Sequence, residues 1–528
     1  MRSRFYVFLG IVVSLSLSAV LSVLPGGVAF ATSFQEDKIE SQLQAVAELF
    51  DGYTVHQIGA AKLYFKRDPT AELAGVGAVM MAGIGNQMPD EAHCAHMAEH
   101  MVLMHPVSNG KSLYSLASAD TEAGTVPPIN GHTSLDSTEY YLAVPREDLD
   151  IALQMLIEAM FDSKVSPGAA YDAEIQRSLN EYTFMTTDDR SAGLNRIKLN
   201  LLRGTVYEEA FFETPLGDVT AEKVRGFIGR EYSPARLSIV VIADCDESHV
   251  VDTLTALLAP YPPGPEAERR VVTVSPPEIE SLHLSAVAKP RVLVGLAVEG
   301  VEEDDYTALS TLLQVITLTA PTDGLNGLER DPVLTLSDQS QHYAGLAVGY
   351  NADPSSSEES LRELALLARE AMRERLAVLA AGGVTDEDLS GEAPAPDPNV
   401  ERLLSQYPQV YLEINMVVSA LIPGRVSPQD LRIAVAGTHG ETRSDGTASA
   451  GEAGSEFRAT LATVAAKYLP QAKLSALYVY GDEILEARES GMEGPYPPAW
   501  LLPAAIVAVA LGGGLYLRRR SSQADRRE

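Results

Sequence analysis

The sequence has too few of certain residues for several common classes of protein. It has only two cysteines in 528 residues, Cys94 and Cys245, so it is not a disulfide-stapled scaffold, although one bridge between them stays open. Lysine and arginine total 40 against 72 aspartates and glutamates, for a formal net charge of -32. Nucleic acid is not an expected partner, because phosphate contacts need a basic face. The acidic balance only weakly favours basic peptides as substrates.

The N-terminal residues predict export. Two arginines precede a largely apolar run over residues 5–24, and an alanine-x-alanine pattern ends at Ala31. We expect a signal peptide at 1–31, cleaved after Ala31, with an uncleaved membrane anchor as the alternative.

The C-terminal residues predict a membrane anchor. Residues 500–517 are apolar and uncharged, and arginines follow directly at 518–520. That run is just long enough to span a bilayer, and its basic flank marks the cytoplasmic side. We expect a transmembrane helix at 499–517 and a cytoplasmic tail at 518–528, which would tether an ectodomain outside the cell membrane. The alternative is a buried C-terminal helix.

Hydrophobic periodicity predicts a chain that mixes strands and helices. In the first half we expect strands at 55–65, 75–81, 132–144 and 237–243, and helices at 90–105, 148–161 and 169–186. In the second half we expect a strand at 292–298 and a helix at 357–381. Prolines concentrate toward a linker at 259–283, between a first domain at 32–258 and a second at 284–490.

A short pattern recurs near the end of each half. Tyr232-Ser233-Pro234 precedes the strand at 237–243, and Tyr468-Leu469-Pro470 precedes a similar apolar run from Leu474. Each follows a helical stretch. The recurrence predicts two structurally related α+β halves, although a helix followed by a strand is common in mixed chains.

A motif with metal-binding spacing lies in the expected helix at 90–105. His96, Glu99 and His100 form H-x-x-E-H, and residues four apart lie on one helical face, so both imidazoles can reach one ion. This is the inverted form of a known zinc motif. The bland interpretation is a polar helix edge with unrelated histidines. A third ligand must come from elsewhere, and Glu174 and Glu181, seven apart, are candidates between which spacing cannot choose.

These residues resemble the zinc peptidases that include pitrilysin, insulysin and the mitochondrial processing peptidase. The resemblance rests first on the stretch from His96 to His100. Further matching segments follow in order: Pro89-Asp90-Glu91, Asn130-Gly131-His132-Thr133, Thr138-Glu139-Tyr140, Glu174 with Glu181, Pro215-Leu216-Gly217, and Tyr232 with Pro234. The resemblance implies two halves, each a mostly antiparallel sheet packed with helices.

The resemblance also implies roles for individual residues. His96, His100 and Glu181 would bind one zinc ion per chain, Glu99 would be the general base, and Glu174 would orient the site. Asn130 and Gly131 would pair with an extended substrate at a strand edge, with an ordinary Asn-Gly turn as the alternative. The implied activity is hydrolysis of unfolded or extended peptides.

One departure from the resemblance favours a second hypothesis. Members of this group usually supply an arginine and a tyrosine, seven apart, from the second half to hold the substrate. Arg330 fits the first position, but Ser337 stands seven later and the nearest tyrosine is Tyr343. The alternative to an active peptidase is therefore an inactive scaffold or partner subunit. A purely structural zinc is less expected, because such sites are usually rich in cysteine. Monomer, homodimer and heterodimer all stay open.

Overall fold

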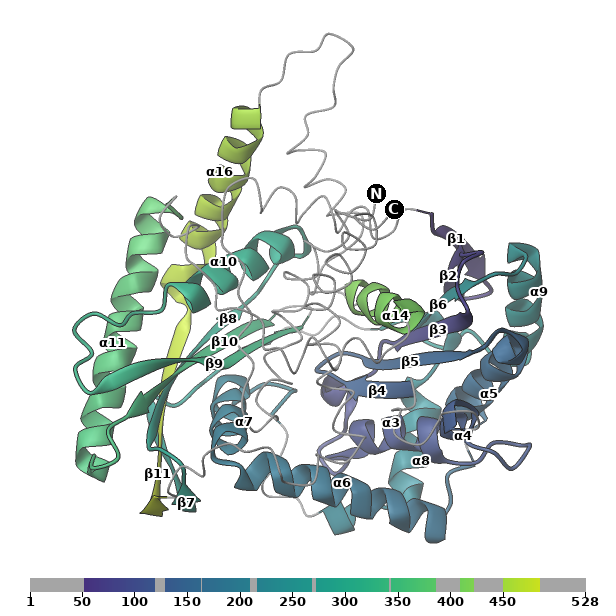
Figure 1. Cartoon of the computed structure of the whole chain (residues 1–528), viewed down its shortest axis with the longest axis horizontal. Coiled ribbons are helices and arrows are strands. Elements are labelled where there is room, and N and C mark those ends of the chain that lie inside the picture. Colours follow the sequence, from purple (N-terminus) through teal and green to yellow (C-terminus); the bar gives the residue numbers. More distant parts are fainter. Residues whose placement is uncertain are drawn as a thin grey trace, which may run out of the picture.

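The computed structural model describes residues 52–118, 129–162, 164–208, 216–267, 272–340, 343–385, 409–421 and 450–484. Two sheets with their covering helices form two halves that lie side by side (Figure 1). The expected signal peptide at 1–31, transmembrane helix at 499–517 and tail at 518–528 lie outside these residues. No helix within the described ranges is long and apolar enough to cross a membrane.

The first half is built on a six-stranded sheet in the order β1-β2-β6-β3-β5-β4. β2 and β6 are parallel, and the other neighbours are antiparallel. The strands are β1 (Thr54–Ile58), β2 (Ala61–Arg67), β3 (Leu73–Met80), β4 (Ile129–Thr133), β5 (Thr138–Pro145) and β6 (Leu237–Ala243). Its helices are α3 (Cys94–Met104), α4 (Leu113–Ser118), α5 (Leu149–Phe161), α6 (Ala169–Thr187), α7 (Asp189–Leu202), α8 (Ala221–Glu231) and α9 (Glu247–Leu258).

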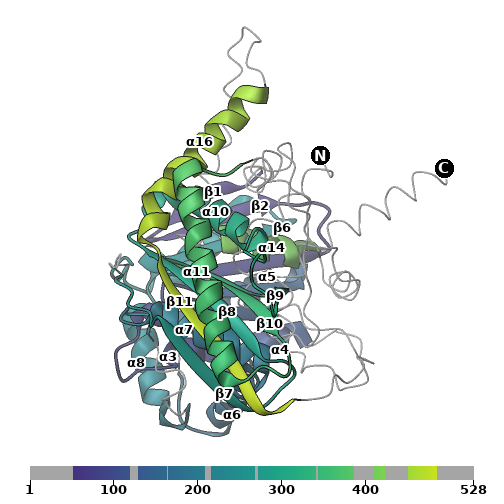
Figure 2. The same cartoon turned by 90° about the vertical axis from the view of Figure 1, so that its left-hand side faces the viewer.

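The second half is built on a five-stranded sheet in the order β7-β11-β8-β10-β9. Its strands are β7 (Ile279–Val287), β8 (Arg291–Glu299), β9 (Leu328–Ser340), β10 (Tyr343–Ala352) and β11 (Lys473–Ile484). Its helices are α10 (Tyr306–Leu318), α11 (Glu358–Gly382), α14 (Gln409–Ala420) and α16 (Ala450–Tyr468). Helix α11 lies along this sheet in Figure 2.

The two sheets have the same topology once β1 is set aside. β7 and β11 are parallel, as β2 and β6 are, and each remaining neighbour pair is antiparallel in both sheets. A short 3-10 helix, Pro234–Arg236 in one half and Leu469–Gln471 in the other, precedes the strand that lies second in this shared order. The recurring Tyr-x-Pro pattern therefore marks the same structural unit in two related α+β halves.

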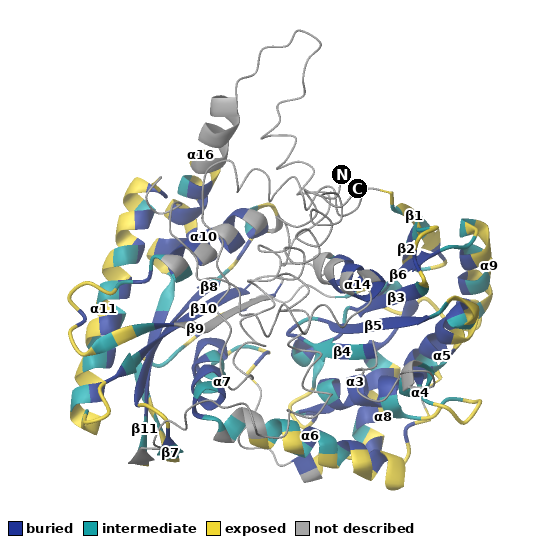
Figure 3. Ribbon diagram, in the orientation of Figure 1, coloured by how far each residue is buried: buried dark blue, intermediate teal, exposed yellow. Residues whose placement is uncertain are grey.

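One helix from each half packs on the sheet of the other half. Helix α7 packs on β8 and β11 of the second sheet, and α14 packs on β3 and β5 of the first. Close packing under α14 depends on Gly75 and Gly77, where an added Cβ would lie 2.7 Å from Ile414 and 2.4 Å from Val418. The halves are thus interlocked, and the buried faces of both sheets are visible in Figure 3.

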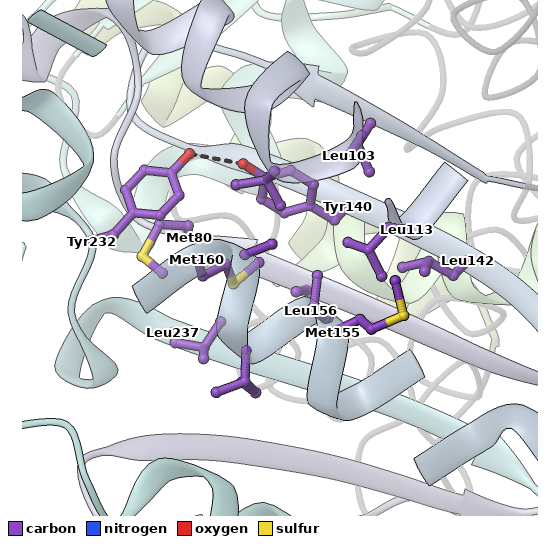
Figure 4. Close-up of a cluster of buried hydrophobic side chains, with 14 of the residues drawn as sticks. Met80, Leu103, Leu113, Tyr140, Leu142, Met155, Leu156, Met160, Tyr232 and Leu237 are labelled. Atoms are coloured by element: carbon purple, nitrogen blue, oxygen red, sulfur yellow. Dashed lines mark hydrogen bonds between the residues drawn. The ribbon is translucent and has the colours of Figure 1, made fainter. Parts of the chain in front are cut away.

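The opposite face of the first sheet is covered by helices of its own half. Met80 and Leu142 pack there with Leu156 and Met160 of α5. Within this apolar cluster the hydroxyl groups of Tyr140 and Tyr232 lie 2.8 Å apart and form a hydrogen bond (Figure 4). This bond ties β5 to the end of α8.

Four expected segments differ from those observed. The expected strand at 55–65 is the hairpin β1–β2, because Gly59 at its turn has a φ of 60°. The expected strand at 132–144 is the end of one hairpin, β4–β5. The helix expected from residue 90 begins at Cys94, because His93 has a left-handed φ of 68°. Strand β7 begins at Ile279, so the last five residues of the linker expected at 259–283 form a strand. Cys94 and Cys245 are not joined in a disulfide.

Because α14 packs directly against Gly77 of β3, we expect Gly77→Val to destabilise the whole chain. The new side chain collides with Val418 and Ile414, and overpacking of this kind costs about 1–3 kcal/mol. Urea unfolding would measure the loss. Gly229→Ala in α8 is the control, since its added Cβ meets nothing within 4 Å and should stabilise by up to about 1 kcal/mol. Equal midpoints for the Gly77→Val and unmodified chains would contradict the packing of α14 on this strand.

Candidate metal centre

Helix α3 presents its two motif histidines toward α6. The helix is held at its start by Glu91, whose carboxylate accepts hydrogen bonds from Arg230 of α8 at 2.9 and 2.6 Å. In addition, the Ala95 amide donates to Gln87 Oε1 at 2.9 Å. The sharp turn at His93 directs the chain into α3, and among the described residues His93 alone combines a side chain with a positive φ.

Three ligand atoms converge between α3 and α6. His96 Nε2 lies 3.3 Å from both His100 Nε2 and Glu181 Oε2, and His100 Nε2 lies 3.5 Å from Glu181 Oε2. Tetrahedral zinc with bonds of roughly 2.0–2.1 Å places its ligand atoms roughly 3.3–3.4 Å apart. These three atoms therefore match one face of a zinc tetrahedron. In the part of the chain that the structure describes, they are the one group with metal-binding geometry.

The structure separates the roles of the two candidate glutamates. Glu174 Oε2 lies 3.2 Å from Nδ1 of His100, the ring nitrogen that faces away from the ligand cluster, and 3.1 Å from Nε of Arg177. Nδ1–H of His100 thus donates a hydrogen bond to Glu174, and the lone pair of Nε2 stays available for a metal. A carboxylate that accepts from the other ring nitrogen is the usual second contact of a metal-binding histidine. Glu181 lies with the ligands, whereas Glu174 orients one of them.

Glu99 is buried beside the ligand cluster. Thr133 of β4 donates a hydrogen bond to its Oε2 at 2.8 Å. An added Cβ at Gly131 would lie 2.6 Å from Glu99 Cγ, so glycine there permits the close approach of strand and carboxylate. Burial raises the pKa of Glu99, and His96, His100 and Thr133 only partly offset this effect. A carboxylate with a raised pKa is the better proton acceptor near neutral pH.

The metal-free cluster holds charges of both signs. Burial opposes protonation of His100, but Glu181 and Glu174 outweigh it and raise its pKa to about 10. Burial likewise opposes ionisation of Glu181, but the two imidazoles outweigh it and lower its pKa.

The remaining expected site residues are divided between the halves. Asn130 and Gly131 lie on β4, which pairs with β5 on one side and with no described strand on the other. Arg330 lies on β9 of the second sheet, where its Nη1 donates to the carbonyls of Asp331 at 2.6 Å and Gly349 at 2.8 Å. Tyr343 is buried in the second half, and the backbone of Ser337 pairs with Leu346 within the second sheet.

The sequence interpretation did not identify Thr133 or Arg177 as functional residues. Arg177 follows Glu174 by three residues on α6, a spacing at which helical side chains meet, so this signal was available. Thr133 lies in the matched segment that begins at Asn130, but its bond to Glu99 joins residues 34 apart, so no local spacing indicated its role.

Together, the duplicated α+β fold and the inverted His–Glu motif define a class of folds with two related halves and one group of residues at metal-binding spacing. A family model described as insulinase, peptidase family M16, matches residues 62–206, and one described as the M16 inactive domain matches residues 218–392. The chain belongs to peptidase family M16, the insulinase family.

Individual relatives agree with this assignment. An uncharacterised zinc protease of Streptomyces coelicolor is 24% identical over 230 residues, which cover 40% of this chain and 48% of the relative. The chain thus matches about half of that relative's length. A solved M16 inactive domain from Pseudomonas fluorescens has a TM-score of 0.57 at 13% identity, covering 81% of this chain and 98% of its own. Pitrilysin has a TM-score of 0.52 at 14% identity, covering 88% of this chain and 48% of its own.

Zinc binding by the metal-free chain should release at least one proton per ion near pH 7.5. His100, with a pKa of about 10, is protonated there, and only the neutral imidazole can bind zinc. The zinc affinity should therefore rise by roughly tenfold per pH unit between pH 7 and 9. Calorimetry in buffers of different ionisation enthalpy measures the proton, with His96→Ala as the control for zinc bound elsewhere. Affinity that does not change with pH would contradict the protonated state of His100.

Proposed function

We propose that this chain is a zinc-dependent endopeptidase or oligopeptidase that cleaves unfolded or extended peptides. The observation that carries the proposal is the combination of His96, His100 and Glu181 at zinc spacing with a buried carboxylate, Glu99, beside them. Zinc held by these residues would supply a Lewis acid that acidifies water and polarises a carbonyl. A site that served only to stabilise the fold would have no use for a proton acceptor.

The residues of the chain divide the remaining work. Glu99 accepts the proton of the attacking water and returns it to the leaving amine, and its raised pKa suits both transfers. Thr133 holds one carboxylate oxygen of Glu99, while Glu174 holds the His100 ring with Nε2 facing the other ligands.

The edge of β4 that pairs with no other described strand is the expected site for the substrate backbone. A peptide that pairs with Asn130 and Gly131 extends the sheet by β-augmentation and passes next to Glu99, which packs on Gly131. Main-chain pairing of this kind needs an extended segment, which is why unfolded peptides are the proposed substrate class.

Location and partners follow from the sequence expectations. A signal peptide at 1–31 and a transmembrane helix at 499–517 would place the peptidase on the extracytoplasmic side of the cell membrane. The chain covers 48% of the length of pitrilysin, so a second chain, identical or different, is a proposed partner.

A second candidate function is supported by the position of Arg330. Its guanidinium donates to carbonyls of its own half, and serine occupies position 337 where the resemblance implies a tyrosine. On this alternative the chain keeps the fold and the metal but acts as a scaffold or partner subunit for another peptidase.

Replacing the proposed base by its amide should separate these functions. We expect Glu99→Gln to lower peptide cleavage by about 10²–10⁴-fold, because it removes the proton acceptor and leaves the ligand atoms in place. The measurement is cleavage of a mixed library of unstructured peptides, with zinc content determined for both proteins. His96→Ala, which should lose zinc and cleavage together, is the control. If the unmodified chain holds zinc but does not cleave, the scaffold function is favoured and the peptidase proposal fails.

Removing the hydroxyl that holds Glu99 should affect the chemical step alone. We expect Thr133→Val to lower kcat by roughly tenfold or more and to leave KM unchanged, since a hydrogen bond to a charged group contributes about 1.5–3 kcal/mol. Thr133→Ser, which keeps the hydroxyl, is the matched control and should retain most of the activity. A change in KM with constant kcat would assign Thr133 to substrate binding instead.

A further inference from the structure

Helix α6, which carries Glu181, is followed almost directly by helix α7, which packs on the sheet of the second half. Helix α6 ends at Thr187 and α7 begins at Asp189. Asp188 between them caps α7, accepting hydrogen bonds from the Ser191 amide at 2.9 Å and hydroxyl at 2.8 Å. Glu181 precedes the end of α6 by about 9 Å along the helix axis. A single residue in an extended conformation, Asp188, separates the two helices, so Glu181 lies only a few residues along the chain from α7.

The first turn of α7 is bound to the second half by a buried ion pair. Asp189 Oδ2 lies 2.6 Å from Arg291 Nη1 of β8, with side-chain exposures of 10% and 3%. The same carboxylate oxygen accepts a hydrogen bond from the Ala288 amide at 2.6 Å. The next residue, Arg190, lies 3.7 Å from Asp331 of β9. Arg291 Nε and Nη1 have no hydrogen-bond partner among the described residues, so the pair is held by its opposite charges and its burial, and either charge alone would be costly to bury.

The rest of α7 packs on the same sheet through apolar side chains. Leu194 and Ile197 form a buried cluster with Leu293 of β8 and Val479 of β11. An added Cβ at Gly295 would lie 3.0 Å from Ile197, so the helix sits close to the strand. By its packing, α7 is part of the second half. In the sequence it follows α6 of the first half directly, as Figure 1 shows.

We propose that the second half positions Glu181 through α7, with Asp189 and Arg291 as the positioning residues. The proposal rests on the proposed function in one respect, namely that His96, His100 and Glu181 bind zinc. Two of these ligands share α3, and only Glu181 comes from another helix. The fit of the centre therefore depends on where α6 is held relative to α3, and errors of a few tenths of an ångström weaken a metal site.

The test removes both charges of the pair from the full chain. Asp189→Leu combined with Arg291→Met leaves no buried charge unpaired, and replacement of both partners by apolar residues is often tolerated. We expect the zinc affinity, measured by competition with a chromophoric chelator, to fall by about 10–100-fold, the range seen when contacts behind a metal ligand are lost. The visible spectrum of the cobalt-substituted protein should change as well, because it reports ligand geometry.

The matched control is a second ion pair between the halves. Lys66 of β2 lies 2.5 Å from Glu413 of α14, and neither residue is on α6 or α7. Lys66→Met combined with Glu413→Gln should leave the zinc affinity within about twofold of the unmodified chain, since it loosens the halves without touching the segment next to Glu181. An equal loss of affinity in both double variants would overturn the specific role of α7.

A measurement on the unmodified chain covers the case in which the Asp189/Arg291 variant does not fold. Coupling between two sites is reciprocal, so zinc binding should in turn slow hydrogen exchange in α7 and β8. Unchanged exchange there, or unchanged zinc affinity in a folded variant, would overturn the positioning role alone. Failure of the unmodified chain to bind zinc would instead overturn the proposed function, and this inference with it.

Discussion

The metal centre depends on holding three ligand atoms from two helices within 3.5 Å of one another. His96 and His100 are four residues apart on α3, so the helix itself fixes their separation. Glu181 is different, because its distance from the imidazoles depends on how α6 lies against α3. The buried contacts around α3, from Glu91 to Arg230 and from Glu174 to His100, all serve to fix this arrangement.

The duplicated fold places a second half, whose described residues form no group with metal-binding geometry, against a helix of the first half. Helix α10 takes the place in the second half that α3 takes in the first, between the equivalent strands β8 and β9, yet its sequence has no histidine, aspartate or glutamate. Helix α7 of the first half packs on the sheet of the second half, and α14 of the second half packs on the sheet of the first. Because each sheet is covered in part by a helix of the other half, the position of each half depends on the other.

Much of this arrangement was predictable from the sequence, for identifiable reasons. The H-x-x-E-H spacing, a helical periodicity, predicts two imidazoles on one face without reference to the rest of the fold. The Tyr-x-Pro recurrence predicts the related halves, which the two sheet orders confirm. The choice between Glu174 and Glu181 needed the resemblance, because residues seven apart occupy one helical face and only the tertiary fold shows which of them faces Nε2 of His100 and which faces Nδ1.

The features that could not be predicted are those set by contacts distant in sequence. Thr133 bonds to Glu99 because a hairpin brings β4 beside α3, and no local pattern indicates this. The expected strands at 55–65 and 132–144 proved to be hairpins, since a strand pattern with a short turn inside it resembles a longer strand. The packing of α7 and α14 on the opposite half's sheet could not be predicted for a related reason. An amphipathic helix shows that it covers a sheet, but its sequence does not say which one.

The burial of Glu99 follows from its close contact with Gly131 of β4, the strand whose outer edge pairs with no other described strand. Gly131 has no side chain, so the carboxylate lies directly against the strand and is buried there, which raises its pKa. The same contact puts the main chain of β4, the expected partner of an extended peptide, next to the proton acceptor. A peptide bound along this edge would shield Glu99 further from water and strengthen its interactions with the charges around it. On the proposed function, the contact at Gly131 would link substrate binding to the environment of Glu99.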